Sequence, residues 1–276
     1  MDGFNGLGEL FANASSLIDS ALVESSVVCF ALMLARAGGW VAMVPMFGAK
    51  GGAGMGRMAI AIAIALALAP VAATRAAEAG VDLPTSPVPF MVAAIGEVAV
   101  GAITGWVTGL LFAAAEMAGS MADATSGLSF ASLVDPVSGS QQASFARLFS
   151  MTFLAVCFAA DAHHLLLAGF AGTLDAVPPG VWPAFEKDAL GAVATGVMAL
   201  MRAAVEIGAP LLGALFLTEV ALGLVSKFYP QMNVLMLGLG VKAGVALSTA
   251  GIALMLMPQR VEPIVSTGLR TLQGIW

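Results

Sequence analysis

The sequence predicts an all-α membrane protein with about six long apolar helical segments. Hydrophobic residues make up 59% of its 276 residues and charged residues only 10%, and the mean hydropathy is +0.96. A soluble domain carries about 25% charged residues, which it needs to cover its surface. Six stretches also approach the roughly 20 apolar residues that a helix needs to cross a bilayer. The chain is therefore built to face lipid or the apolar flanks of other subunits.

The few charges and cysteines exclude several other classes. The 11 Lys and Arg are scattered, so nothing indicates nucleic-acid binding. Cys29 and Cys157 both fall inside apolar stretches, where they are expected to act as small hydrophobic residues and not as a disulfide or metal ligands. The first thirty residues contain acids and no Lys or Arg, the reverse of a signal peptide. The first apolar segment is therefore expected to stay in the mature protein.

The first two stretches cover about residues 26–47, which Arg36 interrupts, and residues 58–69. The second alternates large and small apolar residues. On a helix this alternation forms two alanine rows that permit close approach of another helix: Ala59, Ala63 and Ala67, and Ala61, Ala65 and Ala69. Pro70 is expected to end this helix.

The third stretch, about residues 90–121, is too long for one simple span. Gly101, Gly105 and Gly109 lie four apart on one face of it. This doubled small-xxx-small pattern predicts close helix packing. A chance match is the alternative, because the chain has 32 glycines.

The fourth stretch, about residues 145–170, carries Asp161, His163 and His164 near its far end. Adjacent histidines on a helix point about 100° apart, so they do not converge like the i, i+4 pair of a zinc helix. We expect no metal here, but a polar cluster at a helix end.

The fifth stretch covers about residues 189–224 and is again over-long, with Pro210 inside it. The sixth covers about residues 235–257, and an amphiphilic tail follows at 258–276. Counting six crossings from an acidic outside N-terminus puts the C-terminus outside, although its arginines would favour the inside. Either one stretch does not cross, or the helices are not independent spans in lipid. Unequal lengths and interior charges favour the second possibility.

Seven ionisable residues interrupt the apolar stretches: Glu97, Glu116, Asp161, Arg202, Glu206, Glu219 and Lys242. Each costs about 2.5–3.5 kcal/mol at the centre of a bilayer, so they must pair or face protein or water. Arg202 and Glu206 are four apart and are expected to pair on one helical face. A proton path is one interpretation. Ion pairs between subunits are favoured, because the charges do not cluster at one depth.

A segment of about twenty residues, 123–142, separates two apolar stretches. It is polar at its ends but apolar in its middle, at Leu128, Phe130, Leu133 and Val134. Non-helical backbone at membrane depth is tolerated only where it is buried or lines a water-filled cavity. The pattern favours a loop that folds into a pore and seals it; a plain aqueous loop is the alternative.

Three blocks occur in the order found in the FliR family, inner-membrane components of the flagellar type III export apparatus: GLSFASLVDPVSGSQQ (127–142), DAHHLLL (161–167) and PQMNVLMLGLGVK (230–242). Residues 34–70 also resemble that family's first helical hairpin, so the likeness covers nearly the whole chain. The motif positions outside the loop are His163, His164, Pro230, Gln231 and Asn233. Ala162 departs from the glycine expected there.

The resemblance implies one integral-membrane domain over residues 1–276, arranged as hairpins in a helical export-gate assembly. A P-like hairpin region would cover about 26–130 and the start of the plug loop, and the remaining hairpins, about 145–257, would include a Q-like portion. The implied partners are the FliP and FliQ families, the B and A export components, exported unfolded flagellar proteins and membrane lipid. The implied location is the bacterial inner membrane at the flagellar basal body. No cofactor and no enzymatic activity are implied, because energy comes from a separate ATPase and the proton motive force.

The resemblance also places a pore plug on the loop, with Leu128, Phe130, Leu133 and Val134 as sealing residues. Its remaining positions are Gly127, Ser129, Asp135, Pro136, Gly139 and Gln141. A virulence-type (injectisome) homologue is one alternative. Another is a proton-coupled secondary transporter that uses Asp161, His163 and Glu97. An intramembrane enzyme lacks a nucleophile–base arrangement.

Overall fold

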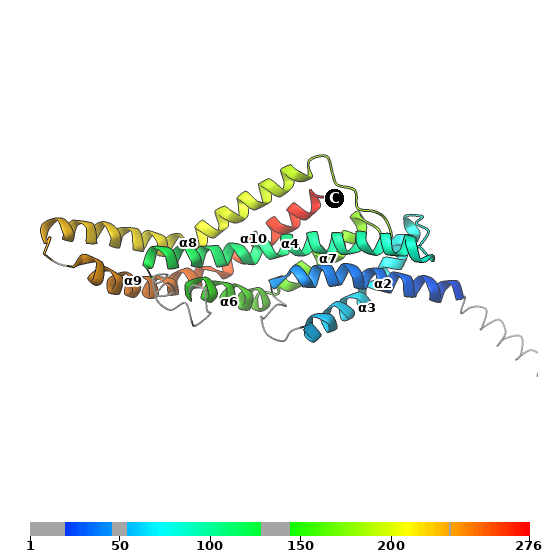
Figure 1. Ribbon diagram of the computed structural model, residues 1–276, viewed down its shortest axis with the longest axis horizontal. Helices are drawn as coiled ribbons and strands as arrows, with labels where there is room; N and C mark the ends of the chain where they lie inside the picture. The colour runs from blue at the N-terminus through cyan, green and yellow to red at the C-terminus, as the bar shows by residue number, and fades with distance from the viewer. Residues whose placement is uncertain (1–19, 46–53, 128–143, 232) are drawn as a thin grey trace, which may run out of the picture. The chain divides into compact units, whose positions relative to one another are not determined.

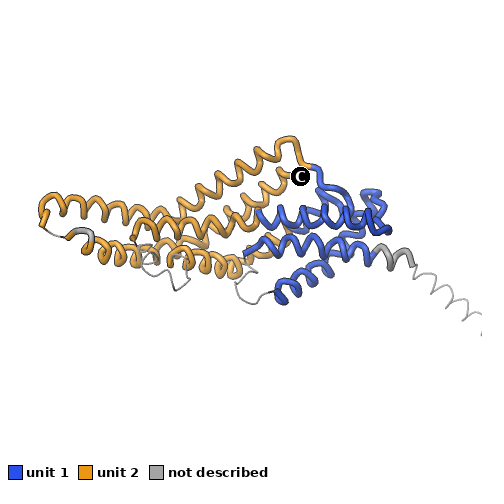
Figure 2. Tube along the Cα trace, viewed as in Figure 1, with its two compact units in different colours: residues 1–106, 170–184, 276 blue, residues 107–169, 185–275 orange. Residues whose placement is uncertain are grey.

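The computed structural model describes residues 20–45, 54–127, 144–231 and 233–276. These residues form eight α-helices and no strand (Figure 1), so the predicted all-α fold is confirmed. The chain divides into two compact units, coloured separately in Figure 2. Unit 1 comprises residues 1–106, 170–184 and 276, and unit 2 comprises residues 107–169 and 185–275. The division into P-like and Q-like portions stays a prediction.

Unit 1 is built on a helical hairpin of α2 (Ser20–Met43) and α3 (Gly54–Glu78). The first half of α4 (Pro87–Ser126) and the end of α7 (Ala162–Ala176) complete it. The two alanine rows of α3 have different environments. Ala61 and Ala65 are buried, whereas the other row is exposed: Ala59, Ala63 and Ala67.

The expected end of a helix at Pro70 is wrong, because α3 continues to Glu78 with the proline inside it. Proline removes one backbone donor, but transmembrane helices tolerate it when their neighbours compensate. Ala72 and Ala76, beyond the proline, are buried and continue the face that Ala61 begins. Packing of this face stabilises the helix beyond the residue at which local propensity would end it.

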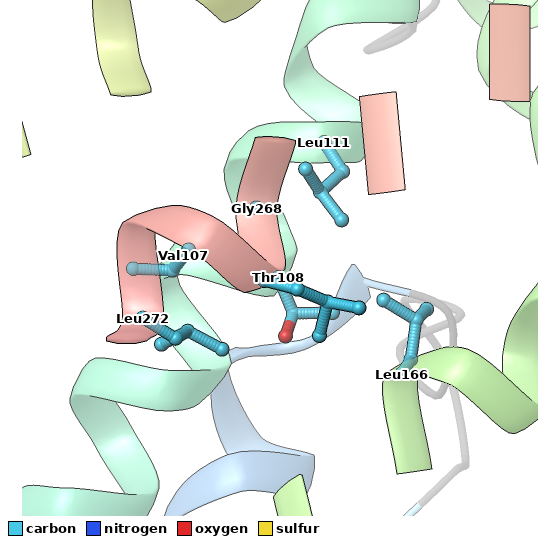
Figure 3. Close-up of a pocket in the computed structure, with 7 residues that line it drawn as sticks. Val107, Thr108, Leu111, Leu166, Gly268 and Leu272 are labelled. Carbon is cyan, nitrogen blue, oxygen red and sulfur yellow. The ribbon is translucent and has the colours of Figure 1, made fainter. Parts of the chain in front are cut away.

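Unit 2 contains α6 (Ser144–Ala159), α8 (Ala189–Phe228), α9 (Val234–Leu256) and α10 (Pro258–Gln273). Helices α8 and α9 pack as a hairpin, and α10 packs against α8, α6 and α9. The amphiphilic tail forms α10, whose buried face comprises Val261, Ile264, Val265, Gly268, Thr271 and Leu272. Figure 3 shows this face beside α4 and the start of α7, around a small apolar cavity. The described residues that line it are apolar apart from Thr108, so the cavity is a packing gap and not a ligand site.

The over-long stretches are single helices. Helices α4 and α8 each contain 40 residues, a length of about 60 Å at 1.5 Å per residue. A bilayer core is only about 30 Å thick. Pro210 lies inside α8, which Figure 1 shows to be bent, and proline is a common cause of such a bend.

The prediction of one helical stretch over residues 145–170 is wrong. Helices α6 and α7 meet at an angle of 81°. Asp161 lies at the break with φ 53°, a left-handed conformation that ends a helix and that Asp adopts more readily than most residues. The amide of Asp161 donates to the carbonyl of Phe158, and its own carbonyl accepts from His164, so the two helices end and begin around it.

Five of the described helices are long and apolar enough to cross a membrane, and counting the bent α6–α7 pair as one span gives six. The five are α2, α3, α4, α8 and α9. The predicted set of about six long apolar segments is therefore confirmed.

Candidate functional site

The candidate gate loop, residues 128–143, begins after α4 and ends before α6. Gly127 follows the last residue of α4 with φ 80°, a left-handed conformation that glycine adopts without steric cost. The other predicted plug residues lie outside the described residues: Leu128, Ser129, Phe130, Leu133, Val134, Asp135, Pro136, Gly139 and Gln141.

The two ends of this loop are joined by Asp123 of α4, whose side chain is only 1% exposed. Its Oδ1 accepts a hydrogen bond from the amide of Phe145 at 3.1 Å, and its Oδ2 accepts one from the amide of Ala146 at 2.9 Å. Both amides lie in the first turn of α6, where helical backbone leaves donors unpaired. A carboxylate is also favoured there by the helix dipole. Asp123 therefore caps α6 from a residue twenty-two positions earlier.

Close backbone contact supports this junction. A Cβ on Gly119 of α4 would lie 2.5 Å from the Cα of Ala146, so only glycine permits α6 to approach this closely. About two helical turns away, the rings of Phe112 and Phe153 meet edge to face with centroids 5.4 Å apart. The loop thus leaves from and returns to a tightly packed helix pair.

Sequence reasoning missed the role of Asp123 and Gly119. A polar residue near the end of an apolar helix was the available signal. Its partner depends on where α6 begins and on which face it packs, neither of which the sequence fixes.

Unit 1 contains a fully buried ion pair between Arg36 of α2 and Glu97 of α4. Their side chains are 0% and 1% exposed, and Arg36 Nε donates to Glu97 Oε2 at 2.5 Å. The other Arg36 nitrogens also have partners: Nη1 donates to Thr173 Oγ1 at 3.1 Å and Nη2 to the carbonyl of Val177 at 2.8 Å. The second oxygen of Glu97 accepts from the amide of Gly180 at 3.0 Å. This buried network joins α2, α4, α7 and the turn that follows α7.

The sequence indicated that Glu97 needs a partner and that Arg36 interrupts an apolar stretch. It did not pair them, because they lie 61 residues apart on different helices. The transporter hypothesis assigned Glu97 to a proton path. Both oxygens of Glu97 are engaged in this network instead.

The predicted glycine face lies against α2 of the same chain. A Cβ on Gly105 would lie 2.7 Å from the carbonyl oxygen of Trp40, and one on Gly101 would collide with the carbonyl of Arg36. Gly39 contributes from the α2 side, since its Cβ would lie 2.6 Å from the carbonyl oxygen of Val98. Gly109 is half-buried. Packing between subunits through these glycines stays a prediction.

Two clusters of charged residues on α8, α9 and α10 of unit 2 form ion pairs that are partly exposed. Glu206 accepts from Arg202 at 2.9 Å, four residues earlier on α8, and from Arg260 of α10 at 2.8 Å. Lys242 of α9 pairs with Glu219 of α8. Arg202 is 83% exposed, Glu219 is 63% exposed, and Glu116 of α4 is also exposed. That these charged residues form ion pairs between subunits stays a prediction.

The motif residues take defined structural positions. Pro230 and Gln231 are exposed in the turn between α8 and α9. Asn233 caps α9, since its side-chain oxygen accepts from the amide of Met236 at 3.3 Å. His163 and His164 lie in the first turn of α7, beside the break at Asp161.

Comparison with known proteins gives consistent matches. Residues 27–268 match the family described as bacterial export proteins, family 1. The chain is 31% identical over 159 residues to the flagellar biosynthetic protein FliR of Bacillus subtilis (strain 168), an alignment that covers 57% of this chain and 61% of that protein. It is 28% identical over 167 residues to FliR of Escherichia coli (strain K12), covering 60% and 62%.

A translocation protein matches as well. The Yop proteins translocation protein T of Yersinia pestis is 30% identical over 151 residues, covering 54% of this chain and 58% of that protein. The aligned part of the chain thus spans about three fifths of the length of these curated relatives. The family match covers most of the chain and agrees with its apolar helices. This chain belongs to the bacterial export proteins of family 1, the FliR family.

Proposed function

We propose that this protein is a structural and gating subunit of the flagellar type III export channel, located at the basal body. In this role it contributes a loop that seals the pore and helps to pass unfolded flagellar subunits across the inner membrane. The proposal rests on the hydrogen bonds by which Asp123 joins the end of α4 to the start of α6, on either side of residues 128–143. A fixed base allows the loop to change position without repacking the helices that carry it.

The chemistry of the loop supports a seal. Its sequence places Leu128, Phe130, Leu133 and Val134 between polar ends. Apolar constrictions gate channels by excluding water and ions. Asp123 and Gly119 hold together the two helices that precede and follow this segment.

The exposure of unit 2 supports assembly with partners. Only 22% of the apolar window of α8 and 17% of that of α9 are buried within the chain, against 56% for α4. Exposed ion pairs on α8 and α9 would be costly against lipid hydrocarbon. We propose that the FliP- and FliQ-family subunits cover part of these helices, and that the assembly associates with the B and A export components.

The test is ion conductance of the assembled channel after co-expression with its neighbouring export genes. Deletion of residues 128–134 is expected to make the channel leak ions. A finer variant replaces the four apolar residues by serine, and a matched control carries Ser138→Ala and Ser140→Ala. Unchanged conductance in both apolar variants, with assembly intact by native mass, would remove the seal from the proposal. Substrate uptake by the lone protein in liposomes would favour a transporter instead.

Injectisome export is a second candidate, which the 30% identity to the Yop translocation protein favours. Complementation separates the two. Restored swimming in a strain that lacks its FliR protein would support the flagellar role. Restored effector secretion alone, in a strain that lacks the injectisome counterpart, would support the other.

A further inference from the structure

We propose that Asp161, His163 and His164 form an open binding site for a divalent transition-metal ion such as Zn²⁺, at the bend between α6 and α7. Each residue offers one ligand atom, and these atoms all lie within 4.8 Å of one another. Imidazole nitrogen and carboxylate oxygen are both ordinary zinc ligands. The site lies within unit 2 and is independent of the gate-loop proposal.

The break in the helix explains how Asp161 comes to lie beside the two histidines. Asp161 has φ 53°, outside the helix, with α7 starting at the next residue. His163 and His164 are adjacent on α7 itself, and their ring centroids lie 4.1 Å apart. The carboxylate oxygen of Asp161 then lies 3.8 Å from Nδ1 of His164. A left-handed conformation at a residue other than glycine is a strain that recurs at functional sites.

The ring of His163 gives a second, independent indication. Its Nδ1 is buried and has no hydrogen-bond partner among the described residues. Buried polar atoms without partners are rare and call for an explanation such as an ion. The ring lies tilted against two others, with its centroid 5.1 Å from that of Phe158 and 4.1 Å from that of His164. Coordination through Nδ1 would supply the partner that this atom lacks.

The exposure of the cluster defines the kind of site. Asp161 and His164 are 77% and 68% exposed, so an ion can reach them directly from solvent. Three protein ligands leave a fourth tetrahedral position for water or for a ligand from a partner. We therefore expect an exchangeable site, in which the ion ties the break at Asp161 to the first turn of α7.

The chain offers an unusually direct test, because His163 and His164 are its only two histidines. The experiment is a Co²⁺ and Zn²⁺ titration of the protein, purified in mild detergent with its co-expressed partners and without a histidine tag. The readouts are calorimetry and the visible absorption of bound Co²⁺. We expect one ion per chain, with binding weakened at least tenfold by His164→Ala, His163→Ala or Asp161→Asn.

Two sets of controls keep the result interpretable. Cys29→Ser, Cys157→Ser and Glu116→Gln remove other possible ligands and are expected to leave binding unchanged. Asp161→Gly removes the carboxylate but relaxes the left-handed backbone, so it is expected to fold at least as stably and still bind more weakly. Absence of stoichiometric binding to the wild type, or binding that survives loss of both histidines, would overturn the site.

Discussion

Two charged clusters of this protein, one in each unit, lie in opposite environments. In unit 1, Arg36 and Glu97 are completely buried, and the arginine and both oxygens of the glutamate engage partners from the same chain. In unit 2, Glu206 and Glu219 also have partners, but they remain 36% and 63% exposed. The first arrangement is complete within the chain, whereas the second presents charge on apolar helices to whatever surrounds them.

This difference separates charged residues that stabilise the fold by themselves from charged residues whose contribution to stability depends on what surrounds the protein. A buried charge that loses its partner is strongly destabilising, because the charge that remains is uncompensated. An exposed pair contributes little to stability in water, but its free-energy contribution changes once lipid or another subunit covers it. The comparison therefore predicts where a substitution changes the protein itself and where it changes only the assembly.

The largest effect is expected for Arg36→Met, which leaves Glu97 buried without its cation. Loss of one partner of a buried pair costs about 3–5 kcal/mol. Denaturant unfolding of the protein in detergent, followed by tryptophan fluorescence, measures this loss.

The double variant Arg36→Met, Glu97→Leu is the control. Replacing both charges by apolar residues of similar size is often neutral or stabilising, so much of the stability should return. A double variant no better than the single one would show that the network contributes more than charge compensation.

The next effect concerns two adjacent glycines of α2. Gly39→Ala would place a Cβ 2.6 Å from the carbonyl oxygen of Val98, and backbone cannot move aside as a side chain can. We expect a loss of about 1–3 kcal/mol from overpacking. Gly38→Ala meets no atom within 4 Å, so it should stabilise the helix by about 0.5–1 kcal/mol. Thermal unfolding of the two variants should move in opposite directions, and equal shifts would contradict the tight contact with α4.

The same region shows how far the sequence could lead. The spacing of Gly101 and Gly105 predicted a close helix contact, and the apolar composition predicted the helices. Neither identified α2 as the surface in contact or Gly39 as its matching residue, because a small-xxx-small pattern describes only one of two faces. The sequence also could not predict that Arg36 is the partner of Glu97, because a pairing across 61 residues depends on how three helices pack.

The two helix boundaries that the sequence misplaced have different causes. Pro70 is a strong local signal for ending a helix, but packing of the alanine face continues α3 beyond it. At Asp161 the helix breaks at a left-handed residue, for which the sequence gives only a weak local signal. The family motifs predict a gate loop, but not the carboxylate of Asp123 that joins α4 to α6.

A smaller effect is expected for Asp123→Ala at the base of the gate loop. Loss of a helix cap costs about 0.5–2 kcal/mol, and the amides of Phe145 and Ala146 lose their acceptors. Hydrogen exchange should speed up in the first turn of α6, and the assembled channel should leak if a fixed base is needed for the seal. Ser120→Ala, on an exposed face of α4, is the matched control. Faster exchange without a leak would separate the cap from gating.

The smallest effect in the isolated protein is expected for Glu206→Gln in unit 2. The residue accepts from Arg202 and Arg260, but exposed pairs contribute only about 0.2–1 kcal/mol. The same substitution should act more strongly in the co-expressed complex if a partner covers this cluster, because two arginines would then be buried with less compensation. Subunit retention on native mass analysis, compared with unfolding of the lone protein, measures the difference. An equal and small effect in both states would mean that Glu206 faces water or lipid headgroups in the assembly, and that the partner contacts lie on the apolar faces of α8 and α9.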